Sequence, residues 1–500
     1  MTATQTILKS NATPSDTAGT EPVETHFKSN QIVDGVLRYP PTDVKVIIVG
    51  GGIAGLFAAV ECWRKGHDVV VVEKGDVVGI GPSGWSTLHN YPTMLKEWDS
   101  IAHAAHWRFC FEDGSPVAPA FEYEYNRQGV AQHAAFPLHN KSIIMRSQLA
   151  KMLGDQCDRF GISFHFGASI TAYEENETLR TATAIAADGR RFTGEVVIAA
   201  DGIGTKSHAV VLGQPHRADS TGFVKFRAVV PSSSLEHHPV VRKVMQNEQE
   251  PEVRLYFGGP GGRHHAVTIL PEVVCFATAV KDDGTATESW SGRVTGQYVL
   301  SKLESPETID PLIVDGFKAL FSSATIVQWL LAMRDPQSKW TSKGGRIVQV
   351  GDSAHSFLPT SGNGANTAIE SSITIAECLR LGGRGGVSIA TQVLTCGLDR
   401  FQRVCVIQQT GLSNRQQMSA EPGDDILRQG KWIWTHRPEV YARENFQQAR
   451  AHIEHGAPFK NANLPPGHKF HQWSLEEELA KEKSQTFTAD LKANGDWSLV

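Results

Sequence analysis

The chain has 500 residues, of which 40% are hydrophobic and 20% are charged. At about 100–200 residues per domain, this length predicts two to four domains or one large interrupted fold. The 53 acidic residues exceed the 48 basic ones, which gives a formal net charge of −5. Because nucleic-acid-binding proteins usually carry a basic face, this balance argues against nucleic acid as the main partner. The composition is that of a globular chain, not of a disordered, collagenous or coiled-coil one.

The first 42 residues are rich in Thr, Ser, Asn and Pro and show no hydrophobic periodicity. They contain no apolar segment of the kind that marks a secretory signal. We therefore expect a mostly disordered leader over residues 1–42. No apolar run in the chain reaches the roughly 18 residues that span a bilayer.

The seven cysteines are odd in number, widely spaced and without a Cys-x-x-Cys pair. This pattern predicts free thiols in a reducing compartment, with no disulfide scaffold and no metal site. We expect a soluble, cytoplasmic protein.

Order is predicted to begin with a strand, a helix and a second strand. Residues 44–49 form a short β-branched run that is typical of a buried parallel strand. Residues 53–64 have a helical pattern, Gly66 ends that helix, and residues 69–72 form the next strand. Together they predict a βαβ unit with a right-handed crossover. A helix over 147–160 and strands between 163 and 200 follow.

The pattern changes between residues 216 and 339. Alternating runs such as 224–229 and a Gly-Pro turn at 258–262 predict a mainly antiparallel sheet, which we interpret as a substrate domain. Residues 346–350 restore a buried strand, followed by a glycine-rich turn and long helices to about residue 419. The predicted fold class is α/β, with a Rossmann-like nucleotide-binding domain over 43–215 and 340–419, interrupted by the substrate domain. Residues 420–500 form a polar C-terminal extension.

The first candidate site is the glycine-rich turn after the first strand, where Gly50, Gly52 and Gly55 fit Gly-x-Gly-x-x-Gly. The first glycine permits the tight turn, the second lets the backbone approach a pyrophosphate, and the third lets the helix pack on the strand. The helix N-terminus offers N–H groups to anionic oxygens. Glu73 ends the second strand, where a carboxylate can accept hydrogen bonds from ribose hydroxyls. An acid there disfavours a 2′-phosphate, so the predicted resident nucleotide is FAD or NAD, not NADP.

Two later turns place an acid beside a glycine at the end of a buried strand. Asp201 follows the strand at 196–200, and Asp352 follows the strand at 346–350. A carboxylate in that position can bind sugar-like hydroxyls. The second of these turns leads through Pro359 to a glycine-rich helix start at Gly362, Asn363, Gly364 and Ala365. Such a helix start can present N–H groups and a positive dipole end to a developing anion.

In this order, the three turns resemble those of the single-component FAD-dependent aromatic monooxygenases of the para-hydroxybenzoate and salicylate hydroxylase type. The resemblance covers most of residues 44–419. Fungal members of the salicylate-hydroxylase-like group also share the segments at 434–439 and 461–467, so the chain resembles the fungal type. The resemblance implies a Rossmann-like FAD-binding domain interleaved with the substrate domain.

The resemblance also implies which residues bind the ADP half of FAD. Gly50, Gly52 and Gly55 match the turn that holds it, and Glu73 matches its ribose ligand. Arg146, at a helix start, matches an arginine that contacts FAD.

Other implied roles concern the flavin end and the substrate. Asp201 matches a motif associated with FAD and with transient NADPH, and Asp352 matches the ligand of the ribityl chain. Pro359 and residues 362–365 match the loop beside the isoalloxazine ring. Arg227 resembles an arginine that faces substrate in some relatives, and its alternative interpretation is a solvated strand arginine.

The implied activity is that of an FAD-dependent monooxygenase of secondary metabolism. It would use NADPH or NADH as a transient cosubstrate and insert one oxygen atom from O2 into an electron-rich aromatic or polyketide-like small molecule, through a flavin C4a-hydroperoxide. An epoxidase or a Baeyer–Villiger-type oxygenase on the same scaffold stays open, as does a non-catalytic FAD-fold binding protein. The sequence is compatible with a monomer or a homodimer.

Overall fold

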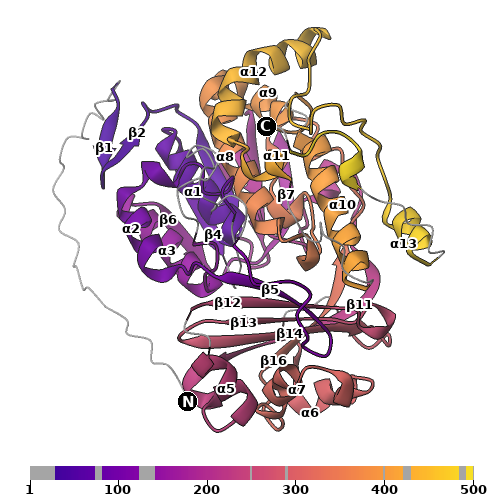
Figure 1. Cartoon of the computed structure of the whole chain (residues 1–500). Coiled ribbons are helices and arrows are strands. Elements are labelled where there is room, and N and C mark those ends of the chain that lie inside the picture. The colour runs from indigo at the N-terminus through magenta and orange to yellow at the C-terminus, as the bar shows by residue number, and fades with distance from the viewer. Residues whose placement is uncertain are drawn as a thin grey trace, which may run out of the picture.

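The computed structural model describes residues 29–73, 81–122, 141–247, 250–287, 291–397, 400–419, 430–483 and 491–498. Two large β-sheets organise this part of the chain (Figure 1). One carries the predicted βαβ unit in the upper half of the view, and the other crosses the lower half. The fold is α/β, as expected from the sequence.

The first sheet is five-stranded and parallel throughout. Its strands are, in spatial order, β17 (Ile347–Gln349), β10 (Val196–Ala199), β3 (Lys45–Val49), β4 (Asp68–Glu73) and β6 (Ser163–Phe166). The predicted strand–helix–strand unit is confirmed, because α1 (Ile53–Arg64) connects β3 to β4.

Both faces of this sheet are covered, which explains the continuous apolar runs of its strands. Val46 and Ile48 face a core shared with α1, α3 (Arg146–Arg159) and α8 (Gly364–Gly382). Ile47 and Val49 face a core shared with a three-stranded antiparallel sheet. The strands of that sheet are β7 (Ile170–Asn176), β8 (Thr181–Ala186) and β9 (Arg191–Gly194).

The second large sheet has seven strands. They are, in spatial order, β15 (Arg293–Val294), β16 (Ile326–Met333), β11 (Asp219–Pro231), β14 (Val273–Lys281), β13 (His264–Ile269), β12 (Glu252–Phe257) and β5 (His106–Phe111). The sheet is mixed, because β12 and β5 pair in parallel whereas the other neighbours pair antiparallel.

Side-chain alternation gives this sheet two different faces. One face, with Phe226 and Phe276, packs against α5 (Pro239–Asn247), α6 (Gly296–Ser301) and α7 (Pro311–Lys318). These helices lie beneath the sheet in Figure 1. The other face is turned toward the five-stranded sheet, with α10 (Arg400–Ser419) beside it. The remaining helices are α2 (Pro92–Ile101), α4 (His208–Val211), α9 (Val387–Gln392), α11 (Lys431–Trp434), α12 (Pro438–His455) and α13 (Leu475–Lys483).

The expected disordered leader needs a correction. Residues 1–28 lie outside the described residues, but β1 (Gln31–Val33) and β2 (Val36–Arg38) form a hairpin. Asp34 and Gly35 turn the chain with φ values of +51° and +72°. Positive φ at both positions matches the twist of a two-residue hairpin, and Asp-Gly is a preferred pair there. The hairpin is held in place because the Val36 side chain is fully buried.

The expected domain boundaries are crossed by β5. The sequence pattern predicts that residues 106–111 belong to the nucleotide-binding domain. In the structure they form the edge strand of the seven-stranded sheet, so this part of the prediction is wrong. Aromatic packing accounts for this position, since the rings of Phe109 and Phe257 lie 5.3 Å apart across β5 and β12.

In the C-terminal extension, α12 contacts α8, one of the helices that cover the five-stranded sheet. Where the extension begins, α11 meets α10, and the Arg403 guanidinium lies 4.7 Å from the ring centroid of Trp432. The same arginine donates to the carbonyl oxygen of Ile433 at 2.9 Å.

A buried ion cluster joins α8 to α10. Glu370 is fully buried on α8 and contacts Arg400 at 2.5 Å and Arg403 at 3.0 Å. Burial opposes its charge, but the two guanidinium groups outweigh that cost and hold the pKa of the carboxyl below its usual range.

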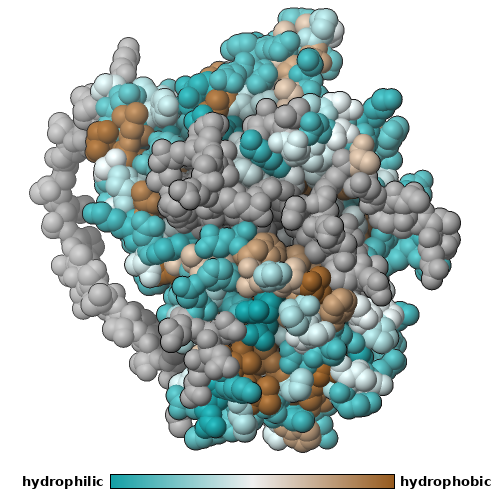
Figure 2. All heavy atoms as spheres, viewed as in Figure 1, coloured by the Kyte–Doolittle hydropathy of each residue, from teal (hydrophilic) through white to brown (hydrophobic). Residues whose placement is uncertain are grey.

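The surface visible in Figure 2 is mostly hydrophilic, and apolar groups gather over the lower half, where the seven-stranded sheet lies. Among the helices of the described residues, none is both long and apolar enough to cross a membrane.

We predict that Glu370→Gln lowers the free energy of unfolding by about 3–5 kcal/mol, because it leaves two buried guanidinium groups without their carboxylate. Urea denaturation followed by circular dichroism measures this loss. The control is Glu454→Gln, which removes the exposed ion pair with Arg450 and should leave the free energy of unfolding nearly unchanged. Equal losses in the two variants would contradict the structural role of the cluster.

Candidate functional site

The three predicted turns meet at one edge of the five-stranded sheet. The last residues of neighbouring strands lie in one row, since Val49 pairs with Ala199 and Ala199 pairs with Gln349. In open parallel sheets, ligands bind outside the carboxyl ends of the strands. Residues 50–55, 200–204 and 351–353 are therefore brought to a common ligand-binding position.

Close backbone contacts confirm that these turns touch. A Cβ on Gly50 would lie 2.3 Å from the carbonyl oxygen of Ala200, and a Cβ on Gly351 would lie 2.8 Å from the Cβ of Ala54. Both glycines have positive φ, +102° and +61°. Only glycine meets both demands without strain.

The first turn has the features that a pyrophosphate requires. A Cβ on Gly55 would lie 1.7 Å from the carbonyl oxygen of Gly50, so helix and turn are in direct contact. Around Gly52, in contrast, the nearest atom to such a Cβ is the Nη2 of Arg146, at 4.0 Å. Gly52 caps α1 without a side-chain hydrogen bond, which leaves the N–H groups of the first turn available to an anion.

Arg146 and Glu73 flank this turn. Arg146 opens α3 as predicted and is half-buried, and its charge acts on the nearby carboxyl of Asp352. Glu73 ends β4, the neighbour of β3, but its side chain lies outside the described part of the chain.

The side chain of Asp352 can be reached by solvent, but enough protein atoms lie near it to desolvate its carboxyl group. Desolvation raises the pKa of its carboxyl, while Arg146 and Arg334 act in the opposite direction. Arg334 also donates from Nη1 to the carbonyl oxygen of Asp352 at 2.9 Å, which fixes the turn. Within the described residues, no hydrogen bond occupies the carboxylate, so it can accept hydroxyl groups of a ribityl chain.

Asp201 is already engaged by the protein. Tyr173 donates to its Oδ2 at 2.6 Å, and Ser353 donates to its Oδ1 at 3.1 Å. Ser353 in turn accepts the backbone N–H of Gly202 at 2.9 Å. Asp201 thus ties the second turn to the third, and its predicted direct contact with FAD stays a prediction.

The start of α8 is open, as a site for negative charge requires. Pro359 and Gly362 are exposed, and Gly362 has a φ of +63°. Asn363 is buried and donates to the carbonyl oxygen of Ser361 at 2.7 Å instead of capping the helix. The N–H groups of residues 364–365 therefore lie at the positive end of a 19-residue helix without a side-chain cap.

Sequence reasoning missed the role of Asn366. Its Oδ1 accepts the N–H of Gly84 at 2.7 Å, and its Nδ2 donates to Ser83 at 2.6 Å. Ser83 then donates to Glu370 at 2.6 Å, which connects this end of α8 to the buried ion cluster. No local pattern marks this pairing, because the partners are nearly 300 residues apart.

The second large sheet turns two cationic side chains toward the same region. Lys225 and Arg227 project from one face of β11, and the Nε of Arg227 donates to the Sγ of Cys275 at 3.3 Å. Burial lowers the pKa of Lys225 to about 8, helped by the charge of Arg227. Lys225 lies two residues before Arg227, so strand alternation alone places it on the same face.

Apolar packing connects this sheet face to the loop before α8. Leu358, the neighbour of Pro359, shares a core with Phe223 and Leu331, which lie on the same face as Lys225. The structure therefore places the predicted ring-side loop and the Lys225–Arg227 face in adjoining positions.

Comparison with known proteins identifies the family of the chain. The family model described as "FAD binding domain" matches residues 43–388. The FAD-dependent monooxygenase mdpD of Emericella nidulans is 35% identical over 499 residues, which cover 92% of this chain and 92% of mdpD. The FAD-dependent monooxygenase fsr3 of Gibberella fujikuroi is 32% identical over 487 residues, with 93% and 91% covered.

Solved structures agree on the fold. CtdE, in complex with FAD and substrate 4, has a TM-score of 0.71 and 25% identity, over 82% of this chain and 99% of CtdE. A salicylate hydroxylase substrate complex has a TM-score of 0.61 and 20% identity, over 80% and 98%.

We predict that Asp352→Ala weakens FAD binding about 10- to 100-fold, because hydrogen bonds to a charged group contribute about 1.5–3 kcal/mol. Fluorescence titration of the apoprotein with FAD measures the dissociation constant. Asp188→Ala, which alters an exposed turn next to β8, serves as the control and should bind FAD like the wild type. Unchanged affinity in Asp352→Ala would exclude this carboxylate as a ligand.

Proposed function

This chain belongs to the FAD-binding monooxygenases of the aromatic hydroxylase type, and we propose that it consumes NADPH or NADH and O2 to insert one oxygen atom into an electron-rich aromatic or polyketide-like small molecule, by the flavin hydroperoxide route. One observation carries the proposal: the turns at 50–55, 200–204 and 351–353 lie together at one edge of the five-stranded sheet. The uncapped start of α8 and the Lys225–Arg227 face of β11 lie beside them. Bound FAD would supply electron transfer and oxygen activation. NAD(P)H would act transiently as the hydride donor.

The cofactor roles proposed for single residues follow the geometry of the turns. Gly50, Gly52 and Gly55 with the α1 N-terminus would hold the pyrophosphate. Arg146 would contact FAD beside Gly52. Glu73 would accept ribose hydroxyls.

At the flavin end, Asp352 would accept the ribityl hydroxyls, and Asp201 would hold its turn in place. Pro359 and residues 362–365 would lie beside the ring, where the α8 N–H groups stabilise negative charge. The helix dipole and the N–H groups act without reorganisation, because the fold fixes them in advance.

On the substrate side, Arg227 and Lys225 would bind an anionic group of the aromatic molecule. Residues 216–339 with α10 would cover the reaction and exclude water, which protects the activated oxygen from decay. The five-stranded sheet with α1, α3 and α8 would bind FAD, whereas β5 belongs with the seven-stranded sheet on the substrate side. The oxygen atom would be transferred to a carbon atom without any protein nucleophile.

Epoxidation and Baeyer–Villiger oxidation need the same cofactor chemistry and differ in how the substrate is oriented. A non-catalytic binding protein is not proposed, because relatives that match over nine-tenths of the chain are monooxygenases.

The test is product analysis by mass spectrometry with 18O2 and NADPH across a panel of phenols and polyketide-like aromatics. The proposal expects substrate-stimulated NADPH oxidation and a product that contains one 18O atom. Ring hydroxylation, epoxide or ester products separate the three oxygenase outcomes. NADPH oxidation that yields only hydrogen peroxide with every compound would contradict the proposal.

We predict that the KM for an accepted aromatic carboxylate rises about tenfold between pH 7 and 9.5. Lys225 is charged below a pKa of about 8 and neutral above it, so the charge-assisted contact is lost as the pH increases. Steady-state kinetics across this range measures the change. In Lys225→Met the KM should be high and flat with pH, whereas Lys281→Met, which alters an exposed lysine on β14, should keep the wild-type profile. A pH-dependent KM that persists in Lys225→Met would exclude Lys225 as the titrating group.

A further inference from the structure

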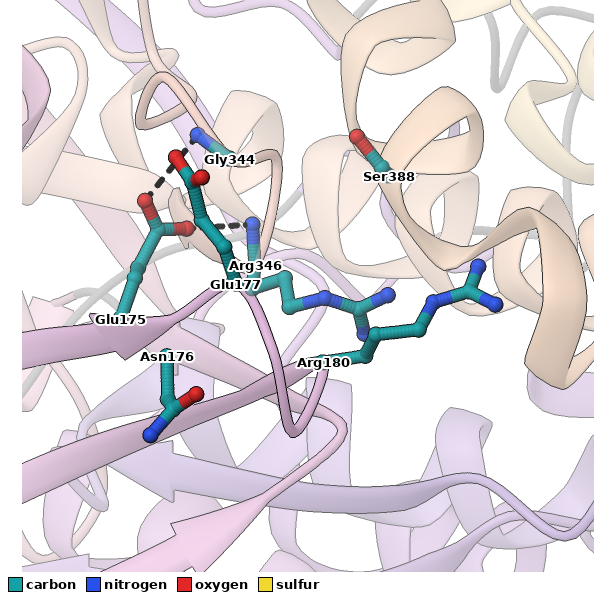
Figure 3. A pocket seen from close by; sticks show the side chains of 7 residues that line it. All are labelled: Glu175, Asn176, Glu177, Arg180, Gly344, Arg346 and Ser388. Atoms are coloured by element: carbon teal, nitrogen blue, oxygen red, sulfur yellow. Dashed lines mark hydrogen bonds between the residues drawn. The ribbon is translucent and has the colours of Figure 1, made fainter.

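A cavity of about 290 Å³ lies away from the three turns. It is formed by the turn between β7 and β8, by residues 344–346, and by the start of α9 (Figure 3). Arg346 stands just before the first residue of β17, whereas Asp352 follows the end of that strand. Because β17 is parallel to its neighbour β10, the cavity lies at the amino edge of the sheet, opposite to the turns.

Arg346 gives the cavity a buried cationic group. The residue has a relative exposure of only 5%. Its Nη1 donates to the carbonyl oxygen of Glu195 at 2.9 Å. In the described part of the chain, its Nε and Nη2 have no protein acceptor, and no carboxylate oxygen lies within 4.0 Å of the guanidinium.

Arg180 brings a second guanidinium to the same place. It occupies the β7–β8 turn with a φ of +56°, a conformation that non-glycine residues rarely adopt. Its Nη2 donates to the carbonyl oxygen of Gly385 at 3.0 Å, so the side chain reaches across the cavity toward α9. In Figure 3 the two arginine side chains extend in the same direction, with Arg180 reaching further than Arg346, and Ser388 lies on the facing helix.

Two of the nearby acids, Glu175 and Glu195, have other partners. Glu175 accepts the N–H groups of Gly344 at 3.0 Å and Arg346 at 2.7 Å. Glu195 pairs with Arg384 at 2.8 Å. Burial and the charge of Arg180 lower the pKa of Arg346, and the two carboxylates only partly offset this.

We propose that this cavity binds the phosphate or carboxylate group of a small anionic ligand, between the guanidinium groups of Arg180 and Arg346. Planar guanidinium groups suit such anions, because each can donate two parallel hydrogen bonds. The volume is at the small end of the range for ligand pockets, about 300–1,000 Å³, and Glu177 at the exposed side disfavours ligands with distributed negative charge.

The test is isothermal titration of the FAD-loaded protein with inorganic phosphate and with citrate, so that the cofactor fills its own anion site. At least one of the two anions should bind with one site per chain. Arg180→Gln should weaken this binding at least about tenfold, since it removes one charge-assisted pair of donors. Arg180→Lys, which keeps the charge but not the planar fork, should also weaken it and covers the case in which Arg180→Gln does not fold.

The matched control is Arg384→Gln, which removes the same charge from a neighbouring arginine that does not line the cavity. It should keep the affinity within about twofold. The proposal is overturned if neither anion binds at about 20 mM, or if Arg180→Gln and Arg180→Lys bind like Arg384→Gln.

Discussion

Three parallel strands that lie side by side, β17, β10 and β3, impose the arrangement on which the proposed site depends. Their last residues pair in one row, so the turns that follow begin at the same level of the sheet. The close approach of Gly50 to Ala200 and of Gly351 to Ala54 leaves no room for larger side chains. The turns are therefore linked by backbone contact, and what remains accessible at this edge is polar: uncapped N–H groups, the carboxylate of Asp352 and the guanidinium of Arg146.

Helix α8 transmits this arrangement to the rest of the chain. Its first turn lies where the flavin ring is expected, and Asn366 in that turn donates to Ser83. Glu370, one turn after Asn366, accepts from Ser83 and pairs with Arg400 and Arg403. Removing one member of a buried ion cluster leaves uncompensated charge, so the cluster holds the helix start firmly. The C-terminal extension packs against the same helix through α12 and against Arg403 through Trp432. The extension also reaches the apolar cluster of Leu358 and Phe223, through Trp473 and Leu475.

The sequence predicted what local pattern determines. The βαβ unit, the glycine turns and the helix that begins at Arg146 all follow from short-range spacing, and the structure contains them. The Asp34-Gly35 pair is a hairpin signal of the same local kind, although it lies in a polar stretch without hydrophobic periodicity. Contacts between residues far apart in the sequence could not be predicted from local pattern. The residues around Glu370 do not indicate that it pairs with Arg403, and those around Asp352 do not indicate its contact with Arg334. Each contact forms only when the sheets and helices pack together.

The most direct test of this account is a crystal structure of the purified protein with FAD. The account predicts the pyrophosphate at the N-terminus of α1 between Gly52 and Arg146, the ribityl chain at Asp352, and the ring beside residues 362–365, with the Lys225–Arg227 face on its far side. Electron density for FAD at any other place, or a ring turned away from the start of α8, would contradict the central claim.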